Sequence, residues 1–465
     1  MKTISSILLT CLFPFQISFA QAGYEIQLQV QGQEDGMAYL GYYFGDNTLL
    51  EDSTMMVDGR CVFKGEKTLD QGMYLVALPN QRGHFDLMVG EDQQFSLSTA
   101  STDLMGQMDV KGSTENMYFY TDLGFVSQMR QESVQLEQAM QEAAGDSTRI
   151  QELQAARAKL DEAVASFRKD LREKHEELFF TTFLNAIEEP QVPDAPEGAD
   201  AYWQFYYYRT HFFDQLDLAD DRLLRTPILH TKVMNYLDRL TPQVVDSIIA
   251  AVDYIIEKSA SNPTTFRYFV STLFNKYNES KQMGMESVVV HLGTKYYLSG
   301  RADWADEEYL TQLRRYLRRL DGNLIGDKGG NFAIEDLLGN MQSVYGIEAD
   351  YLILYFWSYD CGTCKTMTPK LGKLLPPYLE KGVKLFTINT SGTLEEWEEK
   401  LLSYNLPGIH VSDPARKSGF DQVYDVPSTP TIYILDREKI IRYKHISVDQ
   451  IPDILDYELG KKSDD

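Results

Sequence analysis

The sequence predicts a multidomain protein with three folded parts: an N-terminal β-sandwich, an all-helical middle domain and a C-terminal α/β domain. Residues 23–113 alternate apolar and polar side chains in short runs, a pattern typical of half-buried strands. Residues 114–322 carry helix signals, and residues 325–465 contain a buried strand followed by a helix. A chain of 465 residues with 43% hydrophobic residues is long enough for about three domains of ordinary size.

The start of the chain predicts a secretory signal peptide at residues 1–20. A charged start precedes the apolar run Ile4 to Ala20, and small residues suited to cleavage close it. Cys11 faintly resembles the cysteine of a lipoprotein cleavage motif, which makes lipidation the alternative at this end. No later stretch reaches the ~18 to 20 apolar residues of a membrane span. We therefore expect an exported protein of the periplasm or cell envelope.

Charge and cysteine usage narrow the function classes. A formal net charge of -25 argues against nucleic acid or an anionic membrane surface as a partner, because both require a basic face. Four cysteines are present: Cys11 leaves with the signal peptide, Cys361 and Cys364 form a pair, and Cys61 remains. Cys61 lies in a strand-like alternation, where we expect a buried and inert thiol.

The middle region is expected to consist of helices separated by recognisable breaks. Ala144-Gly-Asp-Ser147 separates two long helices, and Thr241-Pro242 and Asn262-Pro263 resemble N-caps with proline at the first helical position. The proline-rich, acidic stretch Glu188 to Pro196 predicts a surface loop. The aromatic runs Tyr202 to Tyr208 and Tyr268-Phe could line a partner groove, but we favour core packing because aromatic side chains supply much buried area.

The C-terminal region begins with a strand that leads directly into a cysteine pair. Tyr351 to Trp357 has the aromatic and aliphatic content of a buried strand, and Lys365 to Leu375 predicts a helix. Further on, the sequence predicts a second strand from Lys384 to Asn389, a helix from Thr393 to Tyr404, and a turn at His410-Val-Ser-Asp-Pro414.

The pair Cys361-Gly-Thr-Cys364 is the candidate redox site. At the start of a helix, free N–H groups and the helix dipole stabilise a thiolate, so the pKa of Cys361 should fall. Cys364 lies three residues on and is close enough to form a reversible disulfide with it. A zinc half-site is a second interpretation, but two more ligands are needed and only scattered histidines such as His410 and His445 are available. A structural disulfide is a third. We expect neither metal nor cofactor.

Two segments resemble thioredoxin-like proteins of the TlpA/ResA type. Phe356 to Pro369 looks like the active-site signature, including Lys365 and Pro369, and Tyr424 to Asp436 resembles the segment with the family's cis-proline. The resemblance implies a thioredoxin-like fold over residues 325–465. It also implies a cis bond at Thr429-Pro430, in a loop that faces the cysteines and binds the client peptide. The two preceding domains resemble domains of unknown function found beside such modules in exported proteins of Bacteroidota.

The sequence departs from this family at positions that handle protons. Tyr355 stands where thioredoxin has a buried aspartate, and Met367 stands where ResA-like proteins have a glutamate. The base for Cys364 is therefore unassigned. Asp360 replaces the usual tryptophan before the first cysteine and should disfavour its thiolate, whereas Lys365 should favour it.

The leading prediction is an exported thiol-disulfide oxidoreductase in which Cys361 attacks, Cys364 resolves the mixed disulfide, and the Thr429-Pro430 loop orients the client. The resemblance implies that it reduces disulfide-containing client proteins and is recharged by a membrane electron donor. An envelope binding or scaffold protein with a low-turnover thioredoxin-like module is the alternative. A thiol peroxidase is a third possibility, although the residues before Cys361 differ from those that precede a peroxidatic cysteine.

Overall fold

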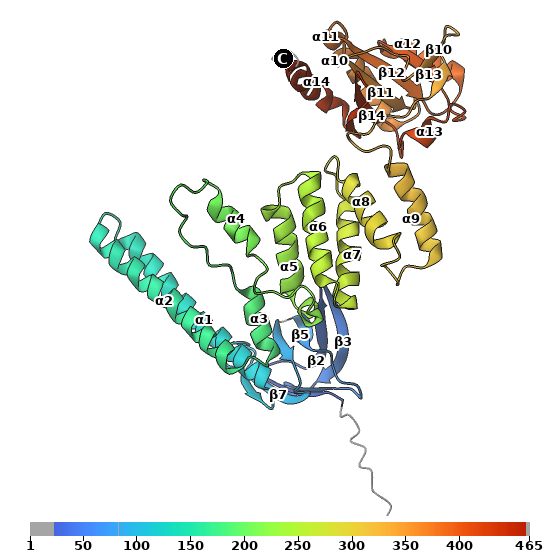
Figure 1. Ribbon diagram of the computed structural model, residues 1–465. Helices are drawn as coiled ribbons and strands as arrows, with labels where there is room; N and C mark the ends of the chain where they lie inside the picture. The colour runs from blue at the N-terminus through green and yellow to red at the C-terminus, as the bar shows by residue number, and fades with distance from the viewer. Residues whose placement is uncertain (1–22, 82, 462–465) are drawn as a thin grey trace, which may run out of the picture. The chain divides into compact units, whose positions relative to one another are not determined.

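The structure is a computed structural model that describes residues 23–81 and 83–461 (Figure 1). The expected signal peptide and Cys11 lie outside the described residues. The described chain divides into two compact units. The first comprises the described residues up to Leu240 together with Lys258–Thr265, and the second comprises Thr241–Glu257 and the described residues from Phe266 on.

The first unit begins with the predicted β-sandwich. Its two four-stranded sheets have the orders β4-β1-β7-β8 and β3-β2-β5-β6. Ile26, Leu28 and Val30 alternate with exposed glutamines and are buried in a core that both sheets share with Cys61. Cys61 is therefore buried as expected, and burial raises its pKa to about 11. The strands are β1 Glu25–Gln31, β2 Gly36–Phe44, β3 Asn47–Met56, β4 Arg60–Lys64, β5 Gly72–Ala77, β6 His84–Val89, β7 Gln94–Ala100 and β8 Asp109–Lys111.

Helices follow the sandwich, and the predicted break between the first two is confirmed. α1 ends at Glu142 and α2 begins at Ser147, where the Asp146 side chain accepts a hydrogen bond from the Arg149 N–H. The acidic, proline-rich stretch after α3 has no regular structure, as predicted. The helices of this part are α1 Thr114–Glu142, α2 Ser147–Lys174, α3 Phe179–Ile187, α4 Trp203–Thr210 and α5 Pro227–Asn235.

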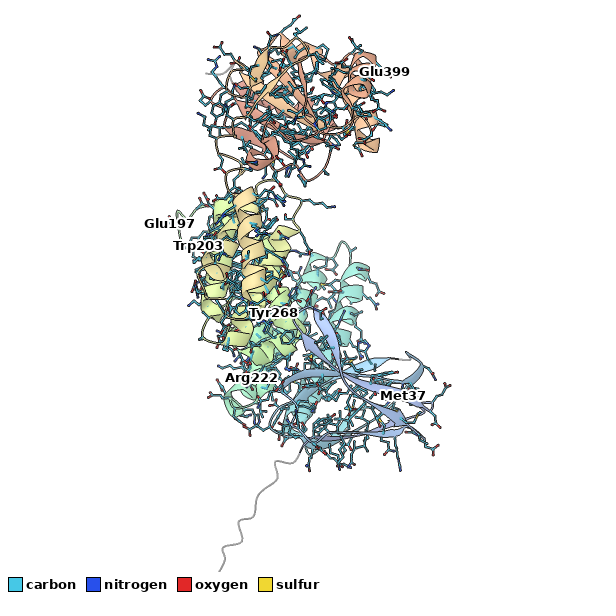
Figure 2. The ribbon with its side chains drawn as sticks, turned by 90° about the vertical axis from the view of Figure 1, so that its right-hand side faces the viewer. Met37, Glu197, Trp203, Arg222, Tyr268 and Glu399 are labelled. Carbon is cyan, nitrogen blue, oxygen red and sulfur yellow. The ribbon has the colours of Figure 1, made fainter. Side chains whose placement is uncertain are left out.

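The expectation that the aromatic run Tyr202 to Tyr208 packs in the core is wrong. α4 buries none of its residues, and Tyr202, Phe205 and Tyr206 are 66%, 40% and 53% exposed (Figure 2, near Trp203). The aromatic residues of α4 come at consecutive positions, so they point to all sides of the helix and cannot share one buried face. In the second run, Phe269 is fully buried.

The remaining helices of the middle region are α6 Val245–Ser259, α7 Pro263–Asn278, α8 Glu286–Leu292 and α9 Glu307–Leu320. The Asn262 side chain accepts from the Thr264 N–H at the start of α7, so that predicted cap is confirmed. Thr241-Pro242 is not a cap, because α6 begins only at Val245. A tight turn, in which the Val244 N–H donates to the Pro242 carbonyl, separates them.

The C-terminal α/β domain is built on a five-stranded mixed sheet of order β13-β12-β11-β14-β15 (Figure 1, orange to red). β11 is parallel to β12 and antiparallel to β14, and it is buried along its whole length. Its odd-numbered residues face one hydrophobic core and its even-numbered residues face another, so both sides of the sheet are covered. The strands are β11 Tyr351–Trp357, β12 Val383–Asn389, β13 Ile409–Ser412, β14 Thr431–Asp436 and β15 Ile441–Lys444, and β9 Ala333–Glu335 and β10 Met341–Ser343 form a separate pair.

One prediction in this domain is wrong, since His410 to Ser412 belongs to strand β13 and not to a turn. β13 extends the sheet parallel to β12, with His410 beside Thr387. Val411 is fully buried, and its β-branched side chain suits a strand. The chain leaves the strand only at Asp413, three residues after the expected start of the turn. The helices are α10 Gly362–Leu374, α11 Pro376–Leu379, α12 Leu394–Tyr404, α13 Phe420–Val423 and α14 Ile451–Lys461.

Within residues 23–81 and 83–461, no helix combines the length and the apolar character needed to cross a bilayer.

Leu354→Ala should destabilise the second unit, because Leu354 is fully buried in β11 and such core truncations cost about 2–5 kcal/mol of unfolding free energy. Leu402→Ala is the matched control, since Leu402 on α12 is 82% exposed, and it should cost less than about 0.5 kcal/mol. Urea unfolding monitored by tryptophan fluorescence measures both, because Trp357 and Trp397 are buried in this domain. Equal losses in the two variants would contradict the central position of β11.

Candidate redox site

The first cysteine lies where the central strand passes into a helix. β11 ends at Trp357, and Cys361 is the N-cap residue of α10, with extended backbone angles (φ -66°, ψ 125°). Its sulfur accepts a hydrogen bond from the Cys364 N–H at 3.2 Å. The Cys361 Sγ therefore occupies the place that a serine or aspartate oxygen takes in an ordinary helix cap.

The two cysteines are free thiols in contact with each other. The Cys364 thiol donates to the Cys361 Sγ, and the sulfurs are 2.6 Å apart. Cys361 is half-buried and borders the exposed residues Asp360 and Gly362, whereas Cys364 is fully buried. A reagent from solution can therefore approach the first sulfur but not the second.

The loop before β14 faces the cysteine pair. The Thr429-Pro430 peptide bond is cis, as the resemblance implies. The Cys361 thiol lies 3.1 Å from the Thr429 carbonyl oxygen and donates to it. Four of the six predicted site residues, namely Cys361, Cys364, Thr429 and Pro430, thus come together at one place.

The surroundings shift the pKa values of the two cysteines in opposite directions. Burial alone would raise the pKa of Cys361, but hydrogen bonds from the Cys364 thiol and N–H outweigh it. Hydrogen bonds with Thr429 and the Thr363 N–H lower the pKa further, so the pKa of Cys361 lies below its ordinary value. Burial, and then the bond to Cys361, raise the pKa of Cys364 to about 12. Of the two thiols, Cys361 therefore ionises more readily and is the better nucleophile for exchange.

Asp360 and Lys365, the two expected modulators of Cys361, flank it on exposed positions. Hydrogen bonds from Ser358, and then from Ser391 at 2.9 Å, lower the pKa of Asp360, so its carboxylate is ionised beside the thiol. Sequence reasoning missed Ser391. Because β11 and β12 are parallel neighbours, residues that follow their carboxyl ends meet at the same sheet edge, and this rule could have identified it.

A pair of hydroxyl groups lies in the core near the buried cysteine. The Tyr355 hydroxyl is 2.9 Å from the Thr368 Oγ1, and both residues are fully buried. Burial raises the pKa of Tyr355, and the nearby cysteines raise it further. Tyr355 shares a hydrophobic core with Cys364, and Met367 is half-buried against it. Neither position supplies a carboxylate to take the proton of Cys364.

Tyr359 connects the redox turn to α12. Its hydroxyl donates to the Glu396 carboxylate at 2.5 Å and accepts from the Thr393 N–H at 3.4 Å. Its ring lies directly on Gly392, where an added Cβ would be 2.0 Å from a ring carbon. Gly392 also has a left-handed φ of +79°, so this contact requires glycine on two grounds.

The histidines considered as zinc ligands are engaged elsewhere. The His410 ring nitrogens face the Thr387 Oγ1 at 2.8 Å and the Leu406 carbonyl oxygen at 2.9 Å. The His445 Nε2 lies 3.2 Å from the Asp425 carbonyl oxygen. In the described part of the chain, no three His, Cys, Asp or Glu side chains form a group that could hold a metal ion.

Family models match three successive parts of the chain. Residues 24–119 match a domain of unknown function (DUF4369), and residues 131–319 match a second one (DUF5106). Residues 325–444 match the AhpC/TSA family. The cysteine pair and the cis-proline loop both lie in the third match.

Individual relatives resemble the same C-terminal part. The thioredoxin-like protein YneN of Bacillus subtilis is 28% identical over 136 residues, which cover 28% of this chain and 76% of YneN. The thiol-disulfide oxidoreductase ResA of Bacillus cereus is 26% identical over 114 residues, which cover 24% of this chain and 65% of ResA.

Solved structures are similar as well. A thioredoxin-like protein from Bacteroides caccae is 22% identical, with a TM-score of 0.45, and the alignment covers 58% of this chain and 98% of that one. A domain of a possible thiol-disulfide isomerase from Cytophaga hutchinsonii is 32% identical, with a TM-score of 0.28, covering 30% of this chain and 97% of that one.

The sheet, the cysteine pair at a helix start and the relatives agree on one assignment. The C-terminal part of this chain is a thioredoxin-like domain that matches the AhpC/TSA family and is similar to thiol-disulfide oxidoreductases, and it follows two regions that match domains of unknown function.

Proposed function

We propose that this protein is an exported thiol-disulfide oxidoreductase that reduces disulfide bonds in client proteins. The observation that carries the proposal is the difference between the two thiols. Cys361 is accessible and has a lowered pKa, whereas Cys364 is buried and has a raised one. Thiol-disulfide exchange requires one thiolate to attack and a second, protected thiol to finish the reaction.

The Cys361 thiolate attacks one sulfur of the client disulfide. The client S–S bond breaks, a mixed disulfide forms on Cys361, and the other client sulfur leaves as a thiolate. Cys364 then loses its proton and attacks the Cys361 Sγ, which breaks the mixed disulfide and releases the second client sulfur as a thiolate. Two electrons pass to the client, and the protein is left with a Cys361–Cys364 disulfide. The Thr429 carbonyl, which contacts the Cys361 thiol, lies where the client backbone would bind.

The proton of Cys364 needs an acceptor, and neither Tyr355 nor Met367 can serve. The client thiolate released in the first step is a stronger base than water and forms next to the pair, so it takes this role in the proposal. The oxidised protein must then be reduced again by a dithiol donor. We propose a membrane-bound donor that faces the compartment to which the predicted signal peptide would send the protein.

A second candidate function is an envelope binding or scaffold protein whose thioredoxin-like module turns over little. The exposed aromatic residues of α4 favour it, since clustered exposed aromatic side chains often mark interaction sites. The two functions differ in their dependence on Cys361. A scaffold would keep its partner when Cys361 is replaced.

Cys361→Ser should abolish the protein's acceleration of insulin reduction by dithiothreitol and leave only the uncatalysed rate, because the protein no longer has its attacking thiolate. Cys61→Ser is the control and should keep full activity, since Cys61 is buried in the sandwich core. Cys364→Ser should accumulate mixed disulfides, visible as thiol-sensitive bands on non-reducing gels. Equal rates for the wild type and Cys361→Ser would favour the scaffold.

The thiol of Cys361 should titrate below that of the same cysteine in the urea-unfolded chain. A lowered pKa means more thiolate at neutral pH, so the pH profile of iodoacetamide alkylation should shift to lower pH in the folded protein. Cys364→Ala should move the profile back toward higher pH, because it removes the thiol that donates to the Cys361 Sγ. An unchanged profile in this variant would show that the contact between the thiols does not set the pKa.

Asp360→Asn should make the protein more oxidising. Removing an ionised carboxylate beside Cys361 favours its thiolate and hence the dithiol form, and about 1.4 kcal/mol corresponds to ~30 mV for a two-electron couple. We expect a rise on the order of 10–30 mV in the reduction potential, measured against glutathione buffers. Glu395→Gln removes an exposed carboxylate on α12 as the control. A fall in the potential would contradict the assigned sign.

A further inference from the structure

The segment that ends in the cis-proline is held at its start and exposed in its middle. It runs from Tyr424 to Pro430, between α13 and β14. Tyr424 and Asp425 are 1% and 5% exposed, whereas Pro427 and Ser428 lie open to solvent. The segment ends at the Thr429 carbonyl beside the Cys361 sulfur. Whatever fixes Asp425 therefore fixes one end of the proposed client-binding loop.

Much of what holds Asp425 comes from the end of α9. The Asp425 N–H donates to the Asn323 Oδ1 at 3.2 Å, and the Arg319 Nε lies 3.0 Å from the Asp425 Oδ1. Asn323 is only 5% exposed, and its own Nδ2 donates back to the Arg319 carbonyl at 3.2 Å. From the sheet side, the Tyr433 hydroxyl donates to the Asp425 carbonyl at 2.9 Å.

A buried lysine, Lys444, connects Asn323 to the start of α8. The Lys444 side chain, on β15, is 1% exposed, and its Nζ donates to the Asn323 carbonyl at 2.9 Å. The Nζ also lies 3.3 Å from the Glu286 Oε1, in the first turn of α8. A buried ammonium group needs such partners, so Lys444 fixes Asn323 and Glu286 against the sheet.

These contacts cross the border between two family matches. One match ends at residue 319 and the next begins at residue 325, yet the compact unit runs from Phe266 into the thioredoxin-like fold without a break there. Arg319 and Glu286 lie on the helical side of this border, and Asp425 and Lys444 lie on the other side.

We propose that the ends of α8 and α9 are part of the client-binding site. Glu286, Arg319 and Asn323 are positioning residues: through Asp425 and Lys444 they set where the Thr429 carbonyl stands relative to Cys361. This inference rests on the proposed function and gives the helical region a role in positioning the client-binding loop. Only three residues separate Asp425 from Thr429, so a shift at one end reaches the other.

The test uses the full-length protein with Arg319→Gln and Asn323→Ala. Arg319 is half exposed, so its variant should fold. The control is Arg437→Gln, which removes an ion pair with Asp350 in the same compact unit but away from the loop. Steady-state reduction of a fluorescent disulfide-linked peptide gives kcat and KM. The pH profile of Cys361 alkylation reports separately on the thiol.

We expect KM to rise about tenfold in Asn323→Ala, equivalent to about 1.4 kcal/mol of binding free energy, with a smaller rise in Arg319→Gln. The kcat value and the alkylation profile should change by less than about twofold, because the sulfurs themselves are not displaced. Hydrogen exchange at the Asp425 amide should speed up in both variants. Arg437→Gln should match the wild type in every measurement.

Three results would overturn the inference. Variants that fold but keep the wild-type KM and amide exchange would show that the contacts do not position the loop. Parallel losses in kcat, KM and alkylation would show general destabilisation instead. A wild-type protein that reduces no peptide would contradict both the proposed function and this inference. An active wild type whose variants keep the same KM and amide exchange would contradict this inference alone.

Discussion

The interaction on which the site depends is the cap that Cys361 makes for α10. The sulfur accepts the Cys364 N–H in the position of an N-cap oxygen, and this bond both orients the thiol and lowers its pKa. The cap is only as rigid as the strand before it. β11 is buried on both faces along its whole length and is hydrogen-bonded to β12 on one side and to β14 on the other. It therefore fixes the start of α10.

The sequence predicted those parts of the fold that local pattern determines. The strand at Tyr351 to Trp357, the cysteine at a helix start and the break between the first two helices follow from side-chain type and capping chemistry. It failed at β13, where tertiary contacts decide, because β13 is a strand through its pairing with β12. It also failed at α4, which is exposed because its aromatic residues have no common face, although their spacing already indicated this. Contacts between segments far apart in sequence, such as Ser391 with Asp360 and Asn323 with Asp425, leave no local signal.

Neither Tyr355 nor Met367, the two core positions near the cysteines, carries a carboxylate that could accept the proton of Cys364. In the core, Tyr355 meets Thr368 through neutral hydroxyl groups, and Cys364 is left with a pKa raised by burial. Asp360, an ionised acid beside the pair, lies on the outside instead and is held by Ser358 and Ser391. The Asp360 charge thus lies on the solvent side, next to the accessible sulfur, while hydrogen bonds from Cys364 lower the pKa of Cys361.

Lys444 has a practical consequence for anyone who excises the redox module. A fragment that starts at residue 325, where the family match begins, lacks Asn323 and Glu286, the two groups that face the Lys444 Nζ. Its ammonium group would remain at a buried position with both of these partners gone. A fragment that keeps Glu286 and Asn323 has to begin upstream of α8, so the sequence match marks a shorter piece than the one that satisfies Lys444.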